Sequence, residues 1–110
     1  MQHSLTEAIL VMTTMPDRAS ADALARALVE GRLAACVNIG ASVDSLYHWR
    51  GQIETATEVP VLIKTRRERY QELESAIRAR HPYELPEIIA VPIERGLPAY
   101  LEWVAAETKS

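Results

Sequence analysis

The sequence predicts a two-layer α+β fold in which strands and helices follow one another in the order βαββαβ, with a further helix at the C-terminal end. Three observations predict this order. Residues 8–15 and 87–93 are short apolar, β-branched runs typical of buried strands. Two stretches with the apolar spacing of amphipathic helices lie between them, and a long pair of strand-like segments joined by a turn occupies the middle of the chain.

Length and composition limit the class of protein. With 110 residues, the chain is expected to form one domain, residues 8–110, preceded by a flexible N-terminal tail, residues 1–7. A net charge of −3 argues against a nucleic-acid surface, which requires clustered positive charge. We expect no membrane segment, because no apolar run reaches the roughly 18 residues of a span. The single cysteine and the lack of a secretory signal predict a cytoplasmic protein.

The first strand and helix have clear boundaries. Pro16 and Asp17 end the strand at 8–15, and Asp17 is a suitable N-cap for a helix that begins at Arg18. Gly31 suits the end of that helix. One apolar stripe is expected to face the sheet, formed by Ala21, Leu24, Ala25, Leu28 and Val29.

The middle of the chain predicts a long hairpin of the second and third strands. The segment 33–49 is strand-like, with a bulge or bend at Gly40, and a turn at 50–52 leads into the strand at 53–65. Pro60 cannot donate to a ladder, so it marks either an edge strand or an irregularity.

The last third predicts a helix, a strand and a helix. Thr65 and Glu68 have the spacing of a capping box, which places the start of the second helix at Arg66. Its apolar face is Tyr70, Leu73, Ala76 and Ile77, and it ends before Pro82. The strand at 87–93 is expected to be buried on both faces. Pro98 then opens a helix whose apolar side is Leu101, Val104 and Ala105.

This order is that of the ferredoxin-like split βαβ pattern. Right-handed crossovers place both main helices on one face of the sheet. The other face is then apolar and uncovered, which predicts an oligomer.

Five segments, correctly ordered, resemble the CutA family, whose members are linked to divalent-cation tolerance. They are LAACVNI (33–39), SLYHWRGQIE (45–54), VLIKT (61–65), HPYELPEI (81–88) and YLEW (100–103). The resemblance extends from about Ile9 to Trp103. It implies a ferredoxin-like homotrimer similar to that of the PII signalling proteins, which bind small ligands in clefts between subunits. It also associates the chain with copper binding, metal tolerance and, for animal members, acetylcholinesterase anchoring.

His81 is the best candidate metal ligand, with Cys36 as a possible soft ligand for copper. Each has a simpler alternative: a histidine at a helix end also satisfies free carbonyls, and a lone strand cysteine is usually a small buried hydrophobe. Some bacterial relatives have a cysteine and a second histidine where this chain has Thr13 and Arg80, which weakens the expectation of copper binding. No cofactor is required; copper or another divalent cation remains a candidate ligand.

The second candidate function is a PII-like regulator that binds a small ligand or a protein partner without metal. The expected intersubunit cleft comprises Trp49, Lys64, Tyr83 and Glu84, and Tyr47 and Trp103 are further aromatic candidates for such a cleft. The basic residues Lys64, Arg66, Arg67 and Arg69 are more simply a solvated face paired with Glu68 and Glu72 than an anion site. Enzymatic motifs are missing from the sequence, and the third strand has no aromatic residue for RNA stacking, so neither catalysis nor RNA binding is expected.

Overall fold

The computed structural model describes residues 6–109, and its order of elements is βαβββαβα, with one 3-10 turn before the second helix. The elements are β1 (Ala8–Met15), α1 (Arg18–Glu30), β2 (Cys36–Ile39), β3 (Val43–Trp49), β4 (Gln52–Arg66), α2 (Tyr70–Arg80), β5 (Ile88–Pro92) and α3 (Pro98–Glu107), and the 3-10 turn is Arg67–Arg69. This confirms the predicted α+β class and the C-terminal helix. No helix within residues 6–109 is long and apolar enough to cross a membrane.

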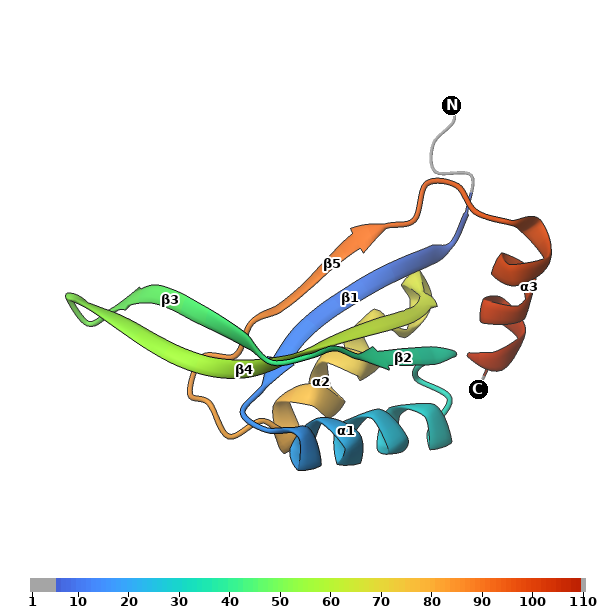
Figure 1. Ribbon diagram of the computed structural model, residues 1–110. Coiled ribbons are helices and arrows are strands. Elements are labelled where there is room, and N and C mark those ends of the chain that lie inside the picture. Colours follow the sequence, from blue (N-terminus) through green and yellow to red (C-terminus); the bar gives the residue numbers. More distant parts are fainter. Residues whose placement is uncertain (1–5, 110) are drawn as a thin grey trace.

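The sheet has the order β2-β4-β1-β5, and every pairing in it is antiparallel. β3 pairs with the outer half of β4, from Val43 opposite Glu58 to Trp49 opposite Gln52. Figure 1 shows α1 and α2 together on one face of the sheet, the β3–β4 hairpin projecting beyond it, and α3 beside its opposite end. The molecule therefore has a body of sheet and helices and a long arm.

The core lies between the sheet and the two helices. Alternate residues of β1 and β4 point toward the helices, and Val11, Val61 and Ile63 are completely buried there. Leu24 and Leu28 from α1, and Leu73 and Ile77 from α2, fill the same core, as their helical spacing predicts.

The first helix begins and ends at the residues that the sequence predicted. The Asp17 carboxylate accepts a hydrogen bond of 2.7 Å from the Ser20 amide, and α1 ends at Gly31. Val29, however, is 44% exposed and does not belong to the buried stripe, so that part of the prediction was wrong. It follows Leu28 directly, and the position sits at the outer margin of the stripe.

The predicted segment 33–49 is divided into β2 and β3. The break falls opposite Pro60, which lies in a central strand and not at an edge. The Gly40 amide donates to the Pro60 carbonyl at 3.0 Å, and a side chain at Gly40 would come within 3.0 Å of the Pro60 ring. Pro60 is therefore the irregularity that the sequence suggested, and the arm bends away from the body at this point.

Two other expectations were wrong. Thr65 is not a helix cap: it belongs to β4, opposite Ile9, and is fully buried, while Glu68 pairs with Arg66. β5 is not buried on both faces, because it is an edge strand whose Ile89 and Val91 are 47% and 41% exposed. Its apolar composition thus reflects a surface that the single chain leaves open.

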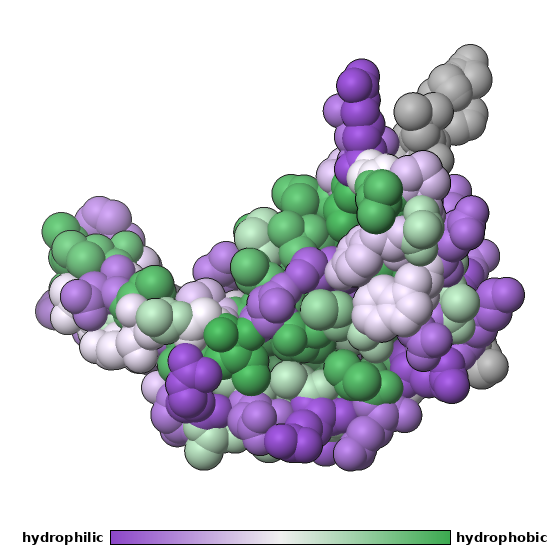
Figure 2. Space-filling model, turned by 45° about the vertical axis from the view of Figure 1, so that its right-hand side comes forward, coloured by the Kyte–Doolittle hydropathy of each residue, from purple (hydrophilic) through white to green (hydrophobic). Residues whose placement is uncertain are grey.

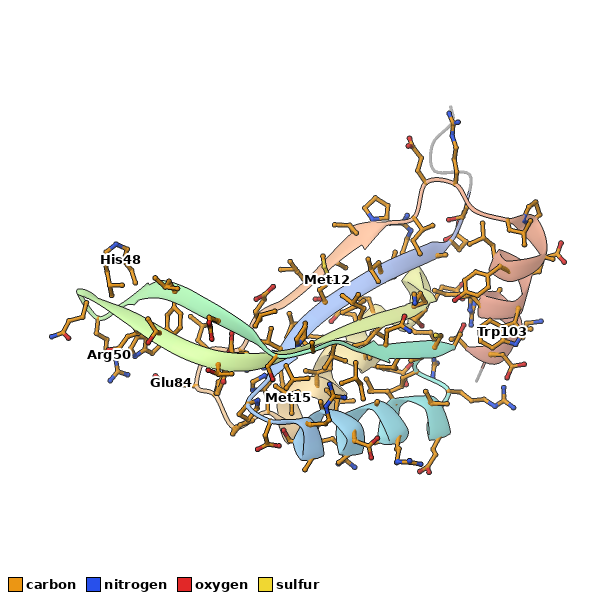
Figure 3. All side chains as sticks on the ribbon, viewed as in Figure 1. Met12, Met15, His48, Arg50, Glu84 and Trp103 are labelled. Atoms are coloured by element: carbon orange, nitrogen blue, oxygen red, sulfur yellow. The ribbon has the colours of Figure 1, made fainter. Side chains whose placement is uncertain are left out.

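That open surface is the face of the sheet opposite the helices. Strand register aligns Cys36, Lys64, Leu10 and Val91 in one row across it, and Asn38, Leu62, Met12 and Ile89 in the next. Figure 3 shows Met15 on the side of the helices and Met12 on the other side. In Figure 2, hydrophobic side chains gather over the strands, whereas hydrophilic ones line the lower edge, where the helices lie. The apolar rows form the open face.

Of the predicted N-terminal tail, residues 1–5 lie outside the described residues. Thr6 and Glu7 are bound to the body: the Thr6 hydroxyl donates to the Ile93 carbonyl at 2.5 Å, and the Arg67 amide donates to the Glu7 carbonyl at 2.7 Å.

Candidate functional site

The structure brings three of the predicted cleft residues together along a hollow between the arm and the loop at 81–87. Trp49 comes from β3, whereas Tyr83 and Glu84 come from the loop between α2 and β5. The hollow has a volume of about 850 Å³ and opens to solvent. Its other lining residues are Thr14, Ser45, Leu46, Tyr47, His48, Ala56, Glu58, Leu85 and Glu87.

A buried carboxylate belongs to the wall of this hollow. Glu58 is only 8% exposed and accepts a hydrogen bond of 3.2 Å from the Thr14 hydroxyl. The Tyr83 phenol also donates to Glu58; burial, followed by this hydrogen bond and the negative charge, raises the pKa of Tyr83. Three segments distant in the sequence thus meet at one carboxylate, which holds the loop against the arm.

His81 lies behind the hollow, where it fixes the corner between α2 and the loop. Its Nε2 lies 2.7 Å from the Thr14 carbonyl, and its Nδ1 accepts a hydrogen bond of 3.2 Å from the Tyr83 amide. A carbonyl can only accept, so Nε2 carries the proton and the ring is the neutral tautomer. Both ring nitrogens are therefore engaged within the chain.

Cys36 and Lys64 belong to a second polar group, on the open face of the sheet. The Lys64 ammonium lies 3.9 Å from the Cys36 sulfur and also donates to the Asn38 side chain. The Tyr100 hydroxyl from α3 contacts Cys36 as well; burial, followed by the proximity of that thiol, raises the pKa of Tyr100. Lys64 thus lies apart from the hollow that holds the other predicted cleft residues.

The two candidate metal ligands do not meet within one chain. In the sheet, Cys36 of β2 lies opposite Lys64 of β4, and Lys64 lies opposite Leu10 of β1. The ring of His81, by contrast, lies against the carbonyl of Thr14, at the other end of β1. The four residues from Leu10 to Thr14 span roughly 13 Å of strand. Across residues 6–109, no group of three or more His, Cys, Asp or Glu side chains is arranged to hold a metal ion.

The arm ends in a turn that places a guanidinium at the rim of the hollow. Arg50 has the left-handed φ of 51°, and Gly51 follows with φ 82°. The Arg50 guanidinium carbon lies 5.2 Å from the centre of the Trp49 ring, and its Nη2 donates to Glu84 at 2.9 Å. Figure 3 shows Arg50 and Glu84 on the same side of the arm, with His48 on the other.

Sequence patterns missed Glu58 and Arg50. Glu58 stands in an alternating strand, where an acidic residue is expected to face solvent, and its partners come from distant segments. The signal for Arg50 was the Arg-Gly turn beside a tryptophan, but its contact with Glu84 required the fold. Trp103, another aromatic candidate for a cleft, instead lies on α3 against Tyr100, with ring centres 5.6 Å apart.

Arg66 and Arg69 pair with Glu68 and Glu72 as the simpler interpretation predicted, but the four basic residues do not form one solvated face, because Arg69 is only 8% exposed and Lys64 contacts Cys36 on the open face of the sheet. Arg66 contacts Glu68, Arg69 contacts Glu72 at 2.9 Å, and Arg67 lies 3.7 Å from Glu7. They form ion pairs within the chain.

The fold is that of a small ferredoxin-like α+β protein. Its antiparallel sheet has helices on one face and an open apolar second face, and a hairpin projects beyond it. Residues 9–107 match the family model described as CutA1 divalent ion tolerance protein. The chain belongs to this family, as the sequence resemblance predicted.

Individual relatives agree with the family match. "Protein CutA" of Mus musculus is 46% identical over 97 residues, which are 88% of this chain but only 55% of the mouse protein. "Divalent-cation tolerance protein CutA" of Thermus thermophilus is 41% identical over 99 residues, which are 90% of this chain and 96% of that protein. A crystal structure of CutA from Xylella fastidiosa superimposes with a TM-score of 0.92 at 42% identity, covering 94% of this chain and 100% of the other.

Proposed function

We propose that this protein acts in divalent-cation tolerance as a homotrimer joined through the open face of its sheet. The observation that carries the proposal is the pair of aligned rows on that face, where Leu62, Ile89 and Val91 are 37%, 47% and 41% exposed and Leu10 and Met12 are half-buried. The function in cation tolerance is proposed from the name of the Thermus thermophilus relative, a divalent-cation tolerance protein that this chain matches over most of its length.

Assembly is the first part to test. Burying an apolar face contributes roughly 25 cal/mol per Å², and a stable interface requires on the order of 1,000 Å² or more. The open face of the sheet and the long arm both expose apolar side chains that such an interface could bury. Light scattering at micromolar concentration is expected to give three times the mass of the 12.3 kDa chain, and a monomer mass contradicts the proposal.

Copper is the cation to test, with His81 as its ligand. A metal at His81 must displace either the Thr14 carbonyl or the Tyr83 amide from the ring, because both nitrogens are engaged. Cys36 lies too far along the sheet to join it within one chain. We therefore expect copper to bind weakly, at micromolar affinity or less, and through His81.

Calorimetry of wild type and His81→Ala tests this ligand. Binding requires neutral imidazole, so affinity is expected to fall as the solution is made more acidic, and the variant is expected to lose most of it. Cys36→Ser is the matched control for the second candidate ligand. Identical isotherms for wild type and His81→Ala leave His81 with a structural role only.

A second candidate function is a PII-like regulator that binds a small ligand without metal. The hollow between the arm and the loop at 81–87 favours it, because it combines aromatic walls with a buried carboxylate. Thermal-shift screening of nucleotides, anions and organic cations, beside metal analysis of a dialysed sample, separates the two functions. We expect no catalytic activity in either case, and the cytoplasm remains the predicted compartment.

A further inference from the structure

The joint between the body and the arm lacks one bond of the sheet ladder. The register of β2 against β4 ends with Ile39 opposite Val61, so Gly40 and Pro60 form the next pair. The Gly40 amide donates to the Pro60 carbonyl at 3.0 Å, which makes this a hydrogen-bonded pair. Residues in such a pair exchange two bonds. Because Pro60 has no N–H, the return bond to the Gly40 carbonyl cannot form.

A side chain from α1 takes the place of the missing donor. The Nη2 of Arg18 donates to the Gly40 carbonyl at 2.7 Å. Arg18 is the first residue of α1, where the helix macrodipole opposes a cation. Helix formation therefore does not account for an arginine at this position, whereas the carbonyl left open by Pro60 does. Figure 1 shows the start of α1 beside the point where the arm leaves the body.

This replacement makes the joint different from the rest of β4. Within the body, backbone bonds hold β4 to β1 on one side and to β2 on the other. At Pro60, the second bond toward β2 comes from an exposed side chain. Exposed side chains change rotamer in picoseconds to nanoseconds, far faster than a strand leaves a ladder. The angle of the arm thus depends on a contact that opens without breaking the sheet.

The angle of the arm in turn determines how wide the hollow is. Ser45, Tyr47 and Trp49 of the arm line one wall of the hollow, and Tyr83 and Glu84 of the loop line the other. The loop belongs to the body, between α2 and β5, so a rotation of the arm about its joint changes the distance between the two walls.

We propose that Arg18 is a positioning residue, a latch that holds the arm at this angle by replacing the amide hydrogen that Pro60 lacks. The joint at Gly40 and Pro60 is then a hinge, and Arg18 is the group that closes it. The proposal depends neither on metal binding nor on the identity of a small ligand, and it adds a conformational element to both candidate functions.

Amide hydrogen exchange, measured by NMR on the full chain, tests the latch. The Gly40 amide is the reporter, because it exchanges when its bond to the Pro60 carbonyl opens. Arg18→Ala is expected to exchange this amide about fivefold faster than wild type, since a charge-assisted hydrogen bond at the joint is lost. Arg26→Ala is the matched control and is expected to exchange it at the wild-type rate. It removes an exposed arginine of the same helix that pairs with Asp22 instead.

A second substitution identifies the bond that Arg18 replaces. Pro60→Ala restores a backbone N–H opposite the Gly40 carbonyl, so the arginine is no longer required there. Adding Arg18→Ala to Pro60→Ala is therefore expected to change the exchange rate of the Gly40 amide by less than about twofold. Mass and melting temperature confirm that each variant is folded and assembled as the wild type is.

The motion of the arm itself is followed through Trp49. The chain has two tryptophans, so a Trp103→Phe background leaves Trp49 as the only one. Arg18→Ala is expected to increase the depolarisation of its fluorescence on the nanosecond timescale, and Pro60→Ala is expected to abolish this increase.

Three results overturn the proposal. If Arg18→Ala exchanges the Gly40 amide no faster than Arg26→Ala does, Arg18 does not hold the joint. If Arg18→Ala accelerates exchange equally with and without Pro60→Ala, it does not act by replacing the missing amide. If exchange accelerates but the depolarisation of Trp49 is unchanged, the contact is local and does not set the angle of the arm.

Discussion

The body and the arm of this molecule are stabilised in different ways, although one strand runs through both. In the body, β4 lies between β1 and β2 and buries Val61 and Ile63 completely against the helices. In the arm, the same strand pairs only with β3, and Ile53 and Leu46 are 68% and 69% exposed. Figure 2 shows hydrophobic atoms at the tip of the arm as well. The body has its own core, whereas the arm has backbone pairing and a few polar contacts to the loop at 81–87, and an isolated hairpin is at best marginally stable. We therefore expect the arm to receive contacts from outside its own chain.

The largest effect is expected from a charge on the open face. Leu62→Glu places a carboxylate in the middle of the row formed by Asn38, Leu62, Met12 and Ile89. Burying an unpaired charge in an interface is strongly unfavourable, so the assembly is expected to dissociate or fail to form. Light scattering measures the mass, and Val29→Glu, at an exposed position on α1, is the matched control. A variant that keeps the wild-type mass places the interface elsewhere.

The next effect concerns the core of the body. Ile63→Ala removes a fully buried side chain from β4 and is expected to lower the free energy of unfolding by about 2–5 kcal/mol through lost burial and a cavity. Urea unfolding at fixed protein concentration measures it. A loss below about 1 kcal/mol is incompatible with the tightly filled core described above.

The same substitution at the other end of β4 sharpens the comparison. Ile53→Ala removes an identical side chain from the arm, where a single chain leaves it 68% exposed. If nothing covers Ile53, the free energy of unfolding changes by no more than about 0.5 kcal/mol. A loss of several kcal/mol shows that another copy of the chain packs against the arm, and a concentration-dependent melting temperature then identifies that copy as the source.

The parts of the fold that sequence predicted well are those governed by neighbouring residues. Asp17 caps α1 through an amide three residues away, and Pro82 ends α2 because it restricts the residue before it. Thr65 and Glu68 show the limit of such rules. They match a capping box, but Thr65 is held in β4 by pairing with Ile9, far away in the sequence, and this tertiary contact overrides the local pattern.

The candidate site was predicted only in part for the same reason. Trp49, Tyr83 and Glu84 are recognisable as cleft residues by type and by family resemblance, and they do meet. Glu58 owes its burial to Thr14 and Tyr83, which no periodicity connects to it. Lys64 lies in the body beside Cys36, so within one chain it does not join the other three, and its place in a cleft between subunits stays a prediction.

The smallest effect tests the bond between the loop and the arm. Tyr83→Phe removes the phenol that donates to Glu58 and is expected to cost about 0.5–1.5 kcal/mol at neutral pH, as a single lost hydrogen bond does. The same bond also predicts a dependence on pH, because burial and the Glu58 contact raise the pKa of Tyr83 above its ordinary value of 10.0.

A phenol whose pKa is higher in the folded state than in the unfolded state stabilises the fold. This stabilisation is complete below the unfolded-state pKa and is lost as pH rises through the folded-state pKa. Wild type is therefore expected to lose stability above about pH 10, and Tyr83→Phe to lose less over the same interval. Tyr70→Phe is the matched variant in the body, because burial and a hydrogen bond to Glu74 raise the pKa of Tyr70 as well. Urea unfolding of the three proteins from about pH 8 to pH 11 measures these slopes. If Tyr83→Phe follows the wild-type slope while Tyr70→Phe does not, the phenol of Tyr83 is free in solution, and the loop is not bound to the arm through Glu58.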